Sequence, residues 1–246
     1  MTRPPGAGFS YEMSDADALR ELIEFLGDFV TPNKREKIAE VLGERTDYVT
    51  VLLEDIYQPH NASAVLRTCE CYGVQNVHIV ENRNQYKVNP QVAMGSSKWL
   101  ELHRYREAGR DNTGDCLGAL RDRGYRIVAT SPDTECRVSH TPADLPLDRP
   151  LAILYGTEEL GLTEGALAAA DSYLRLPQYG FTQSYNISVS VAITLTTLMA
   201  RLRSPDFPGD WRLSEDRSRE LTLAFYRRIV TRHEALERRF REERVS

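Results

Sequence analysis

Apolar positions follow two alternating patterns through the middle of the chain. Short, nearly continuous apolar runs, typical of buried strands, alternate with segments whose apolar residues recur at helical spacing. The strand-like runs occupy residues 48–56, 74–80, 99–105, 125–132, 150–156 and 172–177. The helical patterns occupy residues 61–73, 115–124, 163–171 and 187–202. Strands that alternate with helices predict an α/β fold with a mostly parallel sheet and helices on both faces.

The two ends of the chain predict helices outside this alternation. Residues 14–30 predict an acidic amphipathic helix, and Thr31 followed by Pro32 predicts the start of a second helix. Residues 214–245 predict one long charged helix. We therefore expect three parts: an N-terminal helical extension (1–47), a central domain (48–203) and a C-terminal helical extension (204–246).

Composition is that of an ordinary globular protein, with 41% hydrophobic and 27% charged residues. No apolar run reaches the roughly 18 residues of a membrane span, so we expect no membrane association. The four cysteines form no C-x-x-C pair, which argues against a metal site and favours a reducing cytoplasm. The net charge of −5 argues against a generic nucleic-acid binder, although local basic patches can still bind phosphate.

The signatures of the commonest α/β enzymes are absent. No G-x-G-x-x-G follows the first strand, which argues against a Rossmann-type oxidoreductase. The phosphate loop G-x-x-x-x-G-K-[ST] and the nucleophile elbow G-x-S-x-G are also missing, and the five histidines are scattered. An acyl-transfer triad and a metal hydrolase are therefore disfavoured.

The first polar stretch of interest is PHNASAVLR, residues 59–67. Asn61 is well placed to cap the following helix. Helical spacing puts Ser63 and Arg67 on the face opposite the apolar one. Arg67 is then expected near the carboxyl end of the first strand, where α/β sheets bind ligands. An ordinary solvated arginine fits the same pattern.

A second stretch, LYGTEELGL at residues 154–162, ends a buried strand with a glycine loop. Gly156 and Gly161 permit close approach of the backbone, so the loop amides can bind the edge of a ligand. A plain strand-to-helix connection is the alternative. Glu158 is either a solubilising loop residue or a carboxylate of the site.

The third stretch, LPQYGFTQSYNISVSVAITL at residues 176–195, places polar groups at the start of an apolar helix. Ser184 and Asn186 either cap this helix or line a small-ligand pocket beside the glycine loop.

Together the three stretches resemble the signature motifs of the SpoU/TrmH family, within the SPOUT class of S-adenosylmethionine-dependent RNA ribose 2′-O-methyltransferases. The first motif, N-x-x-x-x-x-R, ends at Arg67, and the second, G-x-E-x-x-G, begins at Gly156. The third is P-x-x-G-x-x-x-S-x-N-x-S, here Pro177, Gly180, Ser184, Asn186 and Ser188. The resemblance covers residues 48–203, including GSSKW at 95–99.

The resemblance implies a C-terminal trefoil knot that holds the cofactor in a bent form, and a homodimer. Within the family the chain is most similar to members that methylate guanosine 18 in the D-loop of tRNA. Two alternatives are a ribosomal RNA ribose 2′-O-methyltransferase of the same family and a non-catalytic RNA-binding paralogue. Tyr185 departs from the aliphatic residue usual at its position.

The resemblance also implies roles for individual residues. Arg67 is the implied catalytic residue, assisted by Asn61, Glu158, Ser184 and Asn186. The implied contacts with S-adenosylmethionine are Thr130, Gly156, Leu176 and Tyr185. We expect RNA phosphates to contact the basic side chains of Lys34, Arg35 and Arg45. No metal is expected, because the sulfonium is already a good leaving group.

The role of Arg67 has two physical interpretations. An arginine side chain is normally protonated, so acting as a general base requires a strong perturbation, with an RNA phosphate assisting. The other interpretation is that Arg67 anchors that phosphate and stabilises the alkoxide. The sequence is compatible with both.

Overall fold

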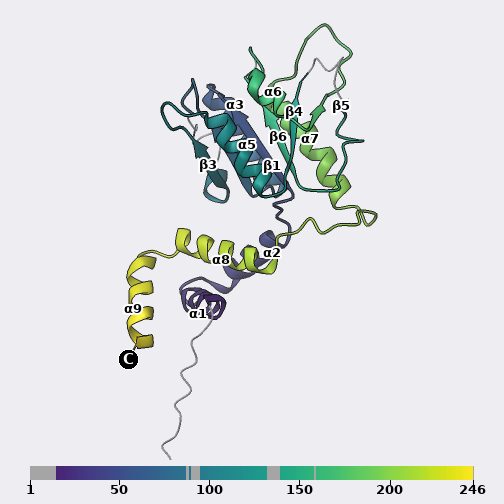
Figure 1. The fold of residues 1–246 in the computed structure, drawn as a ribbon. Helices are drawn as coiled ribbons and strands as arrows, with labels where there is room; N and C mark the ends of the chain where they lie inside the picture. The colour runs from purple at the N-terminus through teal and green to yellow at the C-terminus, as the bar shows by residue number, and fades with distance from the viewer. Residues whose placement is uncertain (1–14, 87–88, 90–94, 132–138, 158, 246) are drawn as a thin grey trace, which may run out of the picture. The chain divides into compact units, whose positions relative to one another are not determined.

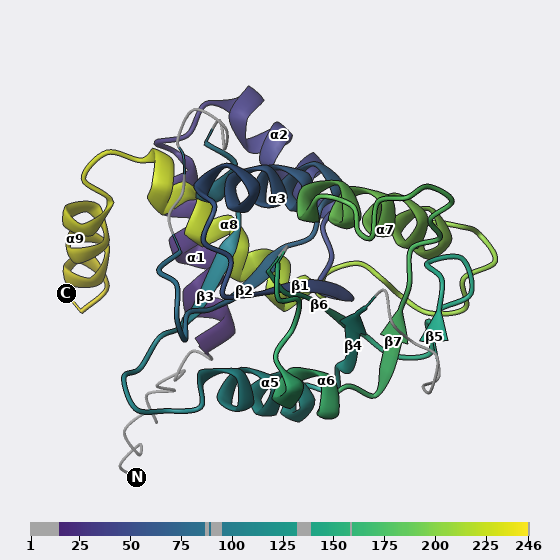
Figure 2. The same ribbon diagram turned by 90° about the horizontal axis from the view of Figure 1, so that it is seen from above.

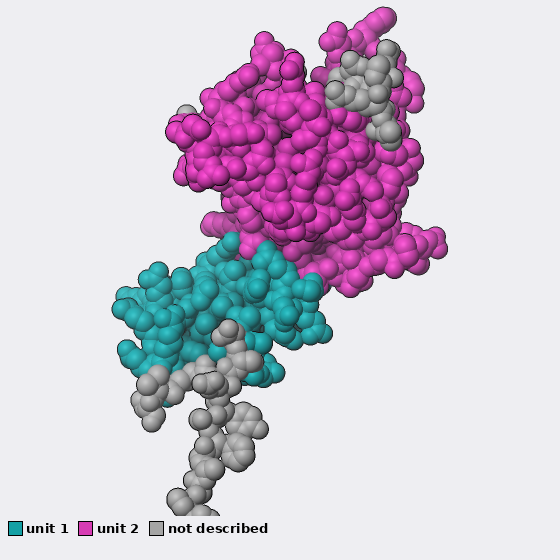
Figure 3. Space-filling model, in the orientation of Figure 1, with its two compact units in different colours: residues 1–43, 214–246 teal, residues 44–213 magenta. Residues whose placement is uncertain are grey.

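The computed structural model describes residues 15–86, 89, 95–131, 139–157 and 159–245. The chain divides into two compact units (Figure 3), one made of residues 44–213 and the other of residues 1–43 together with 214–246. The two helical ends thus belong to one unit. The three-part division at 47/48 and 203/204 stays a prediction.

A seven-stranded sheet forms the centre of the larger unit, within the described residues (Figure 1). The strand order is β3-β2-β1-β6-β4-β7-β5, and every neighbouring pair is parallel. The strands are β1 (Val49–Glu54), β2 (Asn76–Val80), β3 (Glu101–Tyr105), β4 (Arg126–Thr130), β5 (Ser139–His140), β6 (Leu151–Tyr155) and β7 (Ser172–Leu174). The six strand-like runs are confirmed. Strand β5 was not predicted, because its two residues carry no readable periodicity.

Helices cover both faces of the sheet, as predicted. In Figure 2, α3 (Pro59–Tyr72) and α7 (Ile187–Leu202) lie on one face, and α5 (Asn112–Asp122) and α6 (Glu164–Ala168) lie on the other. Along β1, Val51 and Leu53 pack into the core with α3 and α7, whereas Leu52 packs with α5 and α6. Burial on both faces explains why the strands read as continuous apolar runs. A short 3-10 helix, η1 (Ser96–Lys98), precedes β3.

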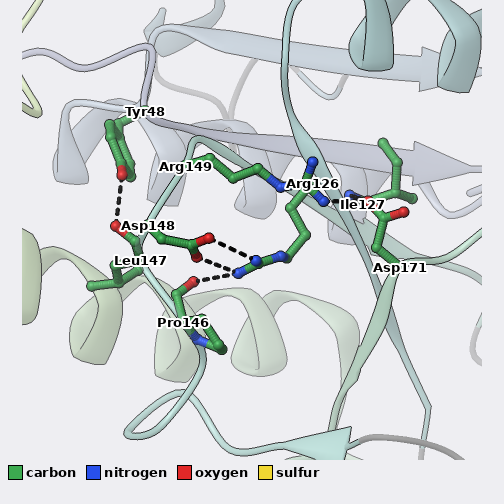
Figure 4. A network of polar contacts seen from close by, with 8 residues as sticks. All are labelled: Tyr48, Arg126, Ile127, Pro146, Leu147, Asp148, Arg149 and Asp171. Carbon is green, nitrogen blue, oxygen red and sulfur yellow. Dashed lines mark hydrogen bonds and ion pairs between the residues drawn. The ribbon is translucent and has the colours of Figure 1, made fainter.

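A polar network fixes the amino-terminal edge of the sheet (Figure 4). Arg126, at the start of β4, donates to both carboxylate oxygens of Asp148 at 2.7 and 3.0 Å. These hydrogen bonds hold the pKa of Asp148 below its ordinary value. Tyr48, just before β1, donates from its hydroxyl to the carbonyl of Leu147 at 2.7 Å. The segment before β6 is thereby attached to β1 and β4, its two neighbours in the sheet. These contacts lie at the end of the sheet where the parallel strands begin.

The smaller unit is helical. Its helices are α1 (Asp15–Gly27), α2 (Pro32–Gly43), α8 (Glu215–Ile229) and α9 (His233–Val245). The prediction of one helix over residues 214–245 is wrong, because the chain turns at Arg232, whose φ is 60°. The turn allows Glu237 to accept two hydrogen bonds from Arg227, and it brings Phe240 to 5.1 Å from Phe25, between ring centroids. No Gly or Pro marks this break in the sequence.

None of the described helices is both long enough and apolar enough to cross a membrane.

Candidate active site

A pocket of about 340 Å³ lies at the carboxyl edge of the sheet. Its walls come from the loops that follow β4 and β6 and from the segment between β7 and α7. The lining includes the four residues predicted to contact a cofactor, together with Ser184: Thr130, Gly156, Leu176, Tyr185 and Ser184. Segments far apart in the sequence thus form one cavity of the size that holds a small organic molecule.

The glycine loop after β6 forms one wall of this pocket. Thr157 and Gly161 pair across the loop through two backbone hydrogen bonds, of 3.1 and 3.0 Å. A Cβ atom on Gly156 would lie 2.1 Å from the carbonyl carbon and oxygen of Gly161. Gly161 itself has a φ of 68°, which glycine adopts most readily. Both glycines are therefore required by the backbone. Glu158 lies outside the described residues.

Two hydroxyl groups fix other parts of the wall. Thr130 donates from Oγ1 to the carbonyl of Leu154 at 2.7 Å, which ties the end of β4 to β6. Tyr185 donates from its hydroxyl to the carbonyl of Pro177 at 3.1 Å and closes the segment before α7 into a loop. The ring of Tyr185 is partly exposed at the pocket.

Asn61 does not cap α3, contrary to the prediction. The helix begins at Pro59, with Gln58 in the capping position, and Asn61 is 4% exposed inside the first turn. Proline is favoured at the first helical position because its missing N–H has no partner there in any helix. Asn61 instead donates from Nδ2 to Oε1 of Gln58 at 2.8 Å.

Ser63 does not lie on a solvent-facing side of α3, so that prediction is also wrong. It is fully buried and donates to the carbonyl of Pro59 at 2.6 Å. Its hydroxyl oxygen also accepts from the backbone N–H of Asn89 at 2.6 Å. Chain from a distant part of the sequence therefore covers this side of the helix, which helical spacing alone does not reveal.

Asn186 takes the first of the two roles that the sequence left open: it caps α7, and it is not among the residues that line the pocket. Its Oδ1 accepts from the backbone N–H of Ser188 at 2.9 Å and so caps α7. Its Nδ2 then faces Oδ1 of Asn61 and donates to it at 3.1 Å. The first and third motifs are thus joined directly, and α3 is attached to the start of α7 at the edge of the pocket.

Arg67 is exposed on α3, six residues after Asn61. Its side chain has no hydrogen-bonding or ion-pairing partner among the described residues, and it is not part of the pocket lining. The structure therefore brings Ser184 together with the cofactor residues, links Asn61 to Asn186, and presents Arg67 to solvent.

The three basic residues predicted to contact RNA lie in different environments. Lys34 and Arg35 are exposed on α2 in the helical unit. Arg45 is 1% exposed and lies in the larger unit, where it donates to Gln75 at 3.0 Å and forms an ion pair with Glu70 at 3.1 Å. A buried and paired guanidinium is unavailable to a phosphate, so the structure does not support Arg45 as an RNA contact.

One supporting residue was missed from the sequence. Glu54, at the end of β1, is 1% exposed and accepts from both the backbone N–H (2.8 Å) and the hydroxyl (2.9 Å) of Thr163. It also accepts from the hydroxyl of Thr113 at 2.7 Å. Glu54 thereby holds the chain that follows the glycine loop. A carboxylate at the end of an apolar strand was the available signal.

Within the described residues, His, Cys, Asp and Glu side chains form no group of three or more that is placed to hold a metal ion.

The SpoU rRNA Methylase family model matches residues 48–196. This match spans more than half of the chain, and the chain therefore belongs to the SpoU methylase family. The resemblance inferred from the three motifs is confirmed.

Known relatives extend the match beyond the sheet. The tRNA (guanosine(18)-2′-O)-methyltransferase of Borreliella burgdorferi is 41% identical over 91% of this chain and 97% of its own length. The crystal structure of the Aquifex aeolicus TrmH/SpoU tRNA modifying enzyme covers 81% of this chain and 98% of that chain, with 26% identity and a TM-score of 0.69. The structure of the SpoU methyltransferase AviRb from Streptomyces viridochromogenes was solved in complex with the cofactor AdoMet. It is 19% identical over 66% of this chain and 63% of its own, with a TM-score of 0.52. This likeness supports the fold alone.

Proposed function

We propose that this protein transfers the methyl group of S-adenosylmethionine to the ribose 2′-hydroxyl of guanosine 18 in the D-loop of tRNA. The observation that carries the proposal is the 41% identity to a tRNA (guanosine(18)-2′-O)-methyltransferase over 91% of this chain and 97% of the relative. A match of that span reaches into the helical ends as well as the sheet domain. It therefore favours the tRNA reaction over methylation of ribosomal RNA.

The pocket suits the methyl donor. Its volume of about 340 Å³ falls within the roughly 300–1,000 Å³ of small-molecule sites. Gly156 contributes no side chain to the lining, so a ligand can lie directly against the backbone amides of the loop. When bound, the donor would supply a methyl group on a sulfonium sulfur, and this sulfur would depart as a neutral thioether. We assign Thr130, Gly156, Leu176 and Tyr185 to holding it.

The remaining task of the protein is to align and activate a weak alcohol nucleophile. The hydrogen bond between Asn61 and Asn186 fixes α3, and with it Arg67, relative to the pocket. The 2′-hydroxyl would lose its proton to water, and the negative charge that this loss places on the 2′-oxygen would be consumed as the oxygen–carbon bond forms and the sulfur–carbon bond breaks, which leaves a neutral ether and a neutral thioether. Arg67 carries a fixed positive charge to that side of the site. We assign it to anchoring an RNA phosphate and stabilising this charge. Ser184, Asn186 and Glu158 complete the surroundings of the nucleotide.

We also propose a homodimer that buries the exposed face of α7 and the segment before it. Val189 and Ile193, one turn apart on α7, are 44% and 37% exposed. Tyr179 and Phe181, before the helix, are 96% and 108% exposed. Apolar side chains gathered in this way are typical of an interaction surface.

The C-terminal trefoil knot implied by the family resemblance is part of the proposal. The strand order agrees with it, since β7 lies between β4 and β5 and the chain then passes through residues 175–186 into α7. We further propose that the protein works in the cytoplasm, where tRNA is modified.

Methyl transfer to defined RNAs tests the proposed function. Purified protein is incubated with labelled S-adenosylmethionine and a tRNA transcript, and the modified ribose is mapped. The expected result is one methylated ribose, at guanosine 18, and no transfer to a transcript with adenosine at that position. Methylation confined to ribosomal RNA fragments would support the other reaction of the family. Binding of S-adenosylmethionine without any turnover would indicate a non-catalytic paralogue.

A further inference from the structure

A second cavity, of about 510 Å³, lies in the same unit as the candidate active site. It is formed by the loops that follow β2 and β3, residues 81–86 and 106–112, and because all the strands are parallel these loops lie at the same end of the sheet as the loops of the cofactor pocket. It shares no lining residue with the cofactor pocket. Four arginines and two glutamates contribute to its lining: Arg83, Arg104, Arg106, Arg110, Glu81 and Glu107.

Asp55 fixes the first of these loops. It follows β1 directly, is 5% exposed and has a φ of 56°. Its Oδ1 accepts from the backbone N–H groups of three successive residues: Asn82 at 2.7 Å, Arg83 at 2.8 Å and Asn84 at 3.3 Å. One buried carboxylate therefore sets the path of the loop on which Arg83 is carried.

The second loop is equally well held. Asn112 accepts from the backbone N–H of Glu107 at 2.8 Å and donates to the carbonyl of the same residue at 3.1 Å. A hydrogen bond of 2.9 Å from Asn82 to the hydroxyl of Thr113 connects the two sides of the cavity. The walls are thus organised before any ligand arrives, which lowers the entropic cost of binding.

The charges in this cavity are only partly compensated. Arg104 donates to both carboxylate oxygens of Glu81, at 2.9 and 2.8 Å. Arg110 pairs with Glu107 at 3.2 Å and also with Asp115, on the adjoining helix. Arg83 and Arg106 are exposed, and no hydrogen bond or ion pair joins the guanidinium group of either one to another residue that the structure describes. Two guanidinium groups that lack a hydrogen-bonded partner among the described residues therefore face one cavity, in a protein whose net charge is −5.

We propose that Arg83 and Arg106 bind the phosphodiester backbone of the RNA substrate next to the nucleotide that is methylated. Guanidinium groups match phosphate oxygens in charge and in hydrogen-bonding geometry. Because the cavity and the cofactor pocket share one edge of the sheet, a strand with its target ribose at the pocket can extend over both. This inference rests on the proposed function, since it takes RNA as the substrate.

Equilibrium binding of a tRNA transcript at several salt concentrations tests the inference. The variants are Arg83→Ala, Arg106→Ala and the double variant. We expect each single change to weaken tRNA binding about three- to tenfold and to reduce the slope of log Kd against log salt by about one. Affinity for S-adenosylmethionine is expected to stay at the wild-type value, and so is kcat at saturating tRNA.

The matched control is Arg123→Ala. Arg123 is an exposed arginine at the far end of α5, 5.5 Å from the centroid of the Tyr125 ring and at the opposite edge of the sheet. The Arg123→Ala substitution removes the same charge as the two test substitutions, and this variant is expected to bind tRNA like the wild type. Wild-type affinity and slope in the double variant, or an equal loss in the control, would overturn the inference. Loss of binding in the variants of a protein that never methylates tRNA would support the RNA contact and contradict only the proposed function.

Discussion

Asn186 donates a hydrogen bond to Asn61 at 3.1 Å, across 125 positions of sequence, while its own Oδ1 caps α7. The cap fixes the orientation of the Asn186 amide, and the amide in turn fixes that of Asn61, which donates to Gln58. One residue thus starts the helix beside the pocket and positions the helix that carries Arg67.

Asn186→Ser separates these two functions. Serine caps helices about as well as asparagine, but its side chain is too short to reach Asn61. We expect the free energy of unfolding to change by less than about 1 kcal/mol and kcat to fall on the order of tenfold. Denaturant unfolding and methyl-transfer kinetics measure the two effects. Asn186→Ala, which loses both bonds, is the control and should lower both quantities. Full activity in the serine variant would contradict the positioning role.

Gly156→Ala is expected to impair cofactor binding. The new Cβ would lie 2.1 Å from the carbonyl of Gly161, so the loop must move. Affinity for S-adenosylmethionine, measured by calorimetry, should fall by at least about tenfold, which corresponds to roughly 1.4 kcal/mol. Gly118→Ala on α5 is the matched control, because no atom lies within 4 Å of its Cβ position. The control should bind normally and gain up to about 1 kcal/mol in stability. Equal affinities in the two variants would contradict the account of the loop.

Glu237→Gln should destabilise the helical unit in a pH-dependent way. The hydrogen bond from Arg227 holds the pKa of Glu237 below its ordinary value, although burial opposes this. The carboxylate therefore contributes fully above the ordinary glutamate pKa of about 4.3, and its contribution disappears as the pH falls through the lowered value. Arg227 is 40% exposed, so we expect a loss of only about 1–2 kcal/mol at pH 7.

Denaturant unfolding at neutral and acidic pH measures this difference between the wild type and Glu237→Gln. The difference should shrink as the solution is acidified. Glu243→Gln removes the exposed pair with Arg239 and should have no measurable effect at either pH. A difference for Glu237 that is constant with pH would mean that its charge is not the source of the stabilisation.

Ile193→Asp tests the proposed dimer. A carboxylate at the exposed face of α7 cannot be buried against a second copy without a large desolvation cost. Light scattering should report a dimer for the wild-type protein and a monomer for this variant. Phe29→Asp replaces an apolar side chain that is more exposed than Ile193, 50% against 37%, and lies in the helical unit; this variant should remain dimeric. A monomeric wild type, or a dimeric Ile193 variant, would refute the interface.

The sequence predicted those features that depend on local pattern. Continuous apolar runs located six strands, and the glycine pair of the second motif located one wall of the pocket. Tertiary contacts decided the rest. Asn61 reads as a cap, but Pro59 begins the helix earlier. Arg45 reads as a surface base, but it is buried against Glu70 and Gln75, which lie 25 and 30 positions away. The turn at Arg232 interrupts a helical pattern without Gly or Pro, because packing around Glu237 outweighs local propensity.

Single-turnover methyl transfer to tRNA, compared between the wild type and Arg67→Ala, tests most directly whether the pocket and the exposed arginine form one active site. We predict that the wild type methylates only the ribose of guanosine 18. We predict that Arg67→Ala slows the transfer by at least on the order of 100-fold, which is the loss typical of removing one charge-stabilising group. Its affinity for S-adenosylmethionine should stay within about twofold of the wild-type value, because Arg67 lies outside the pocket lining. A wild-type rate in that variant, or a methyl group mapped to another position, would contradict the account.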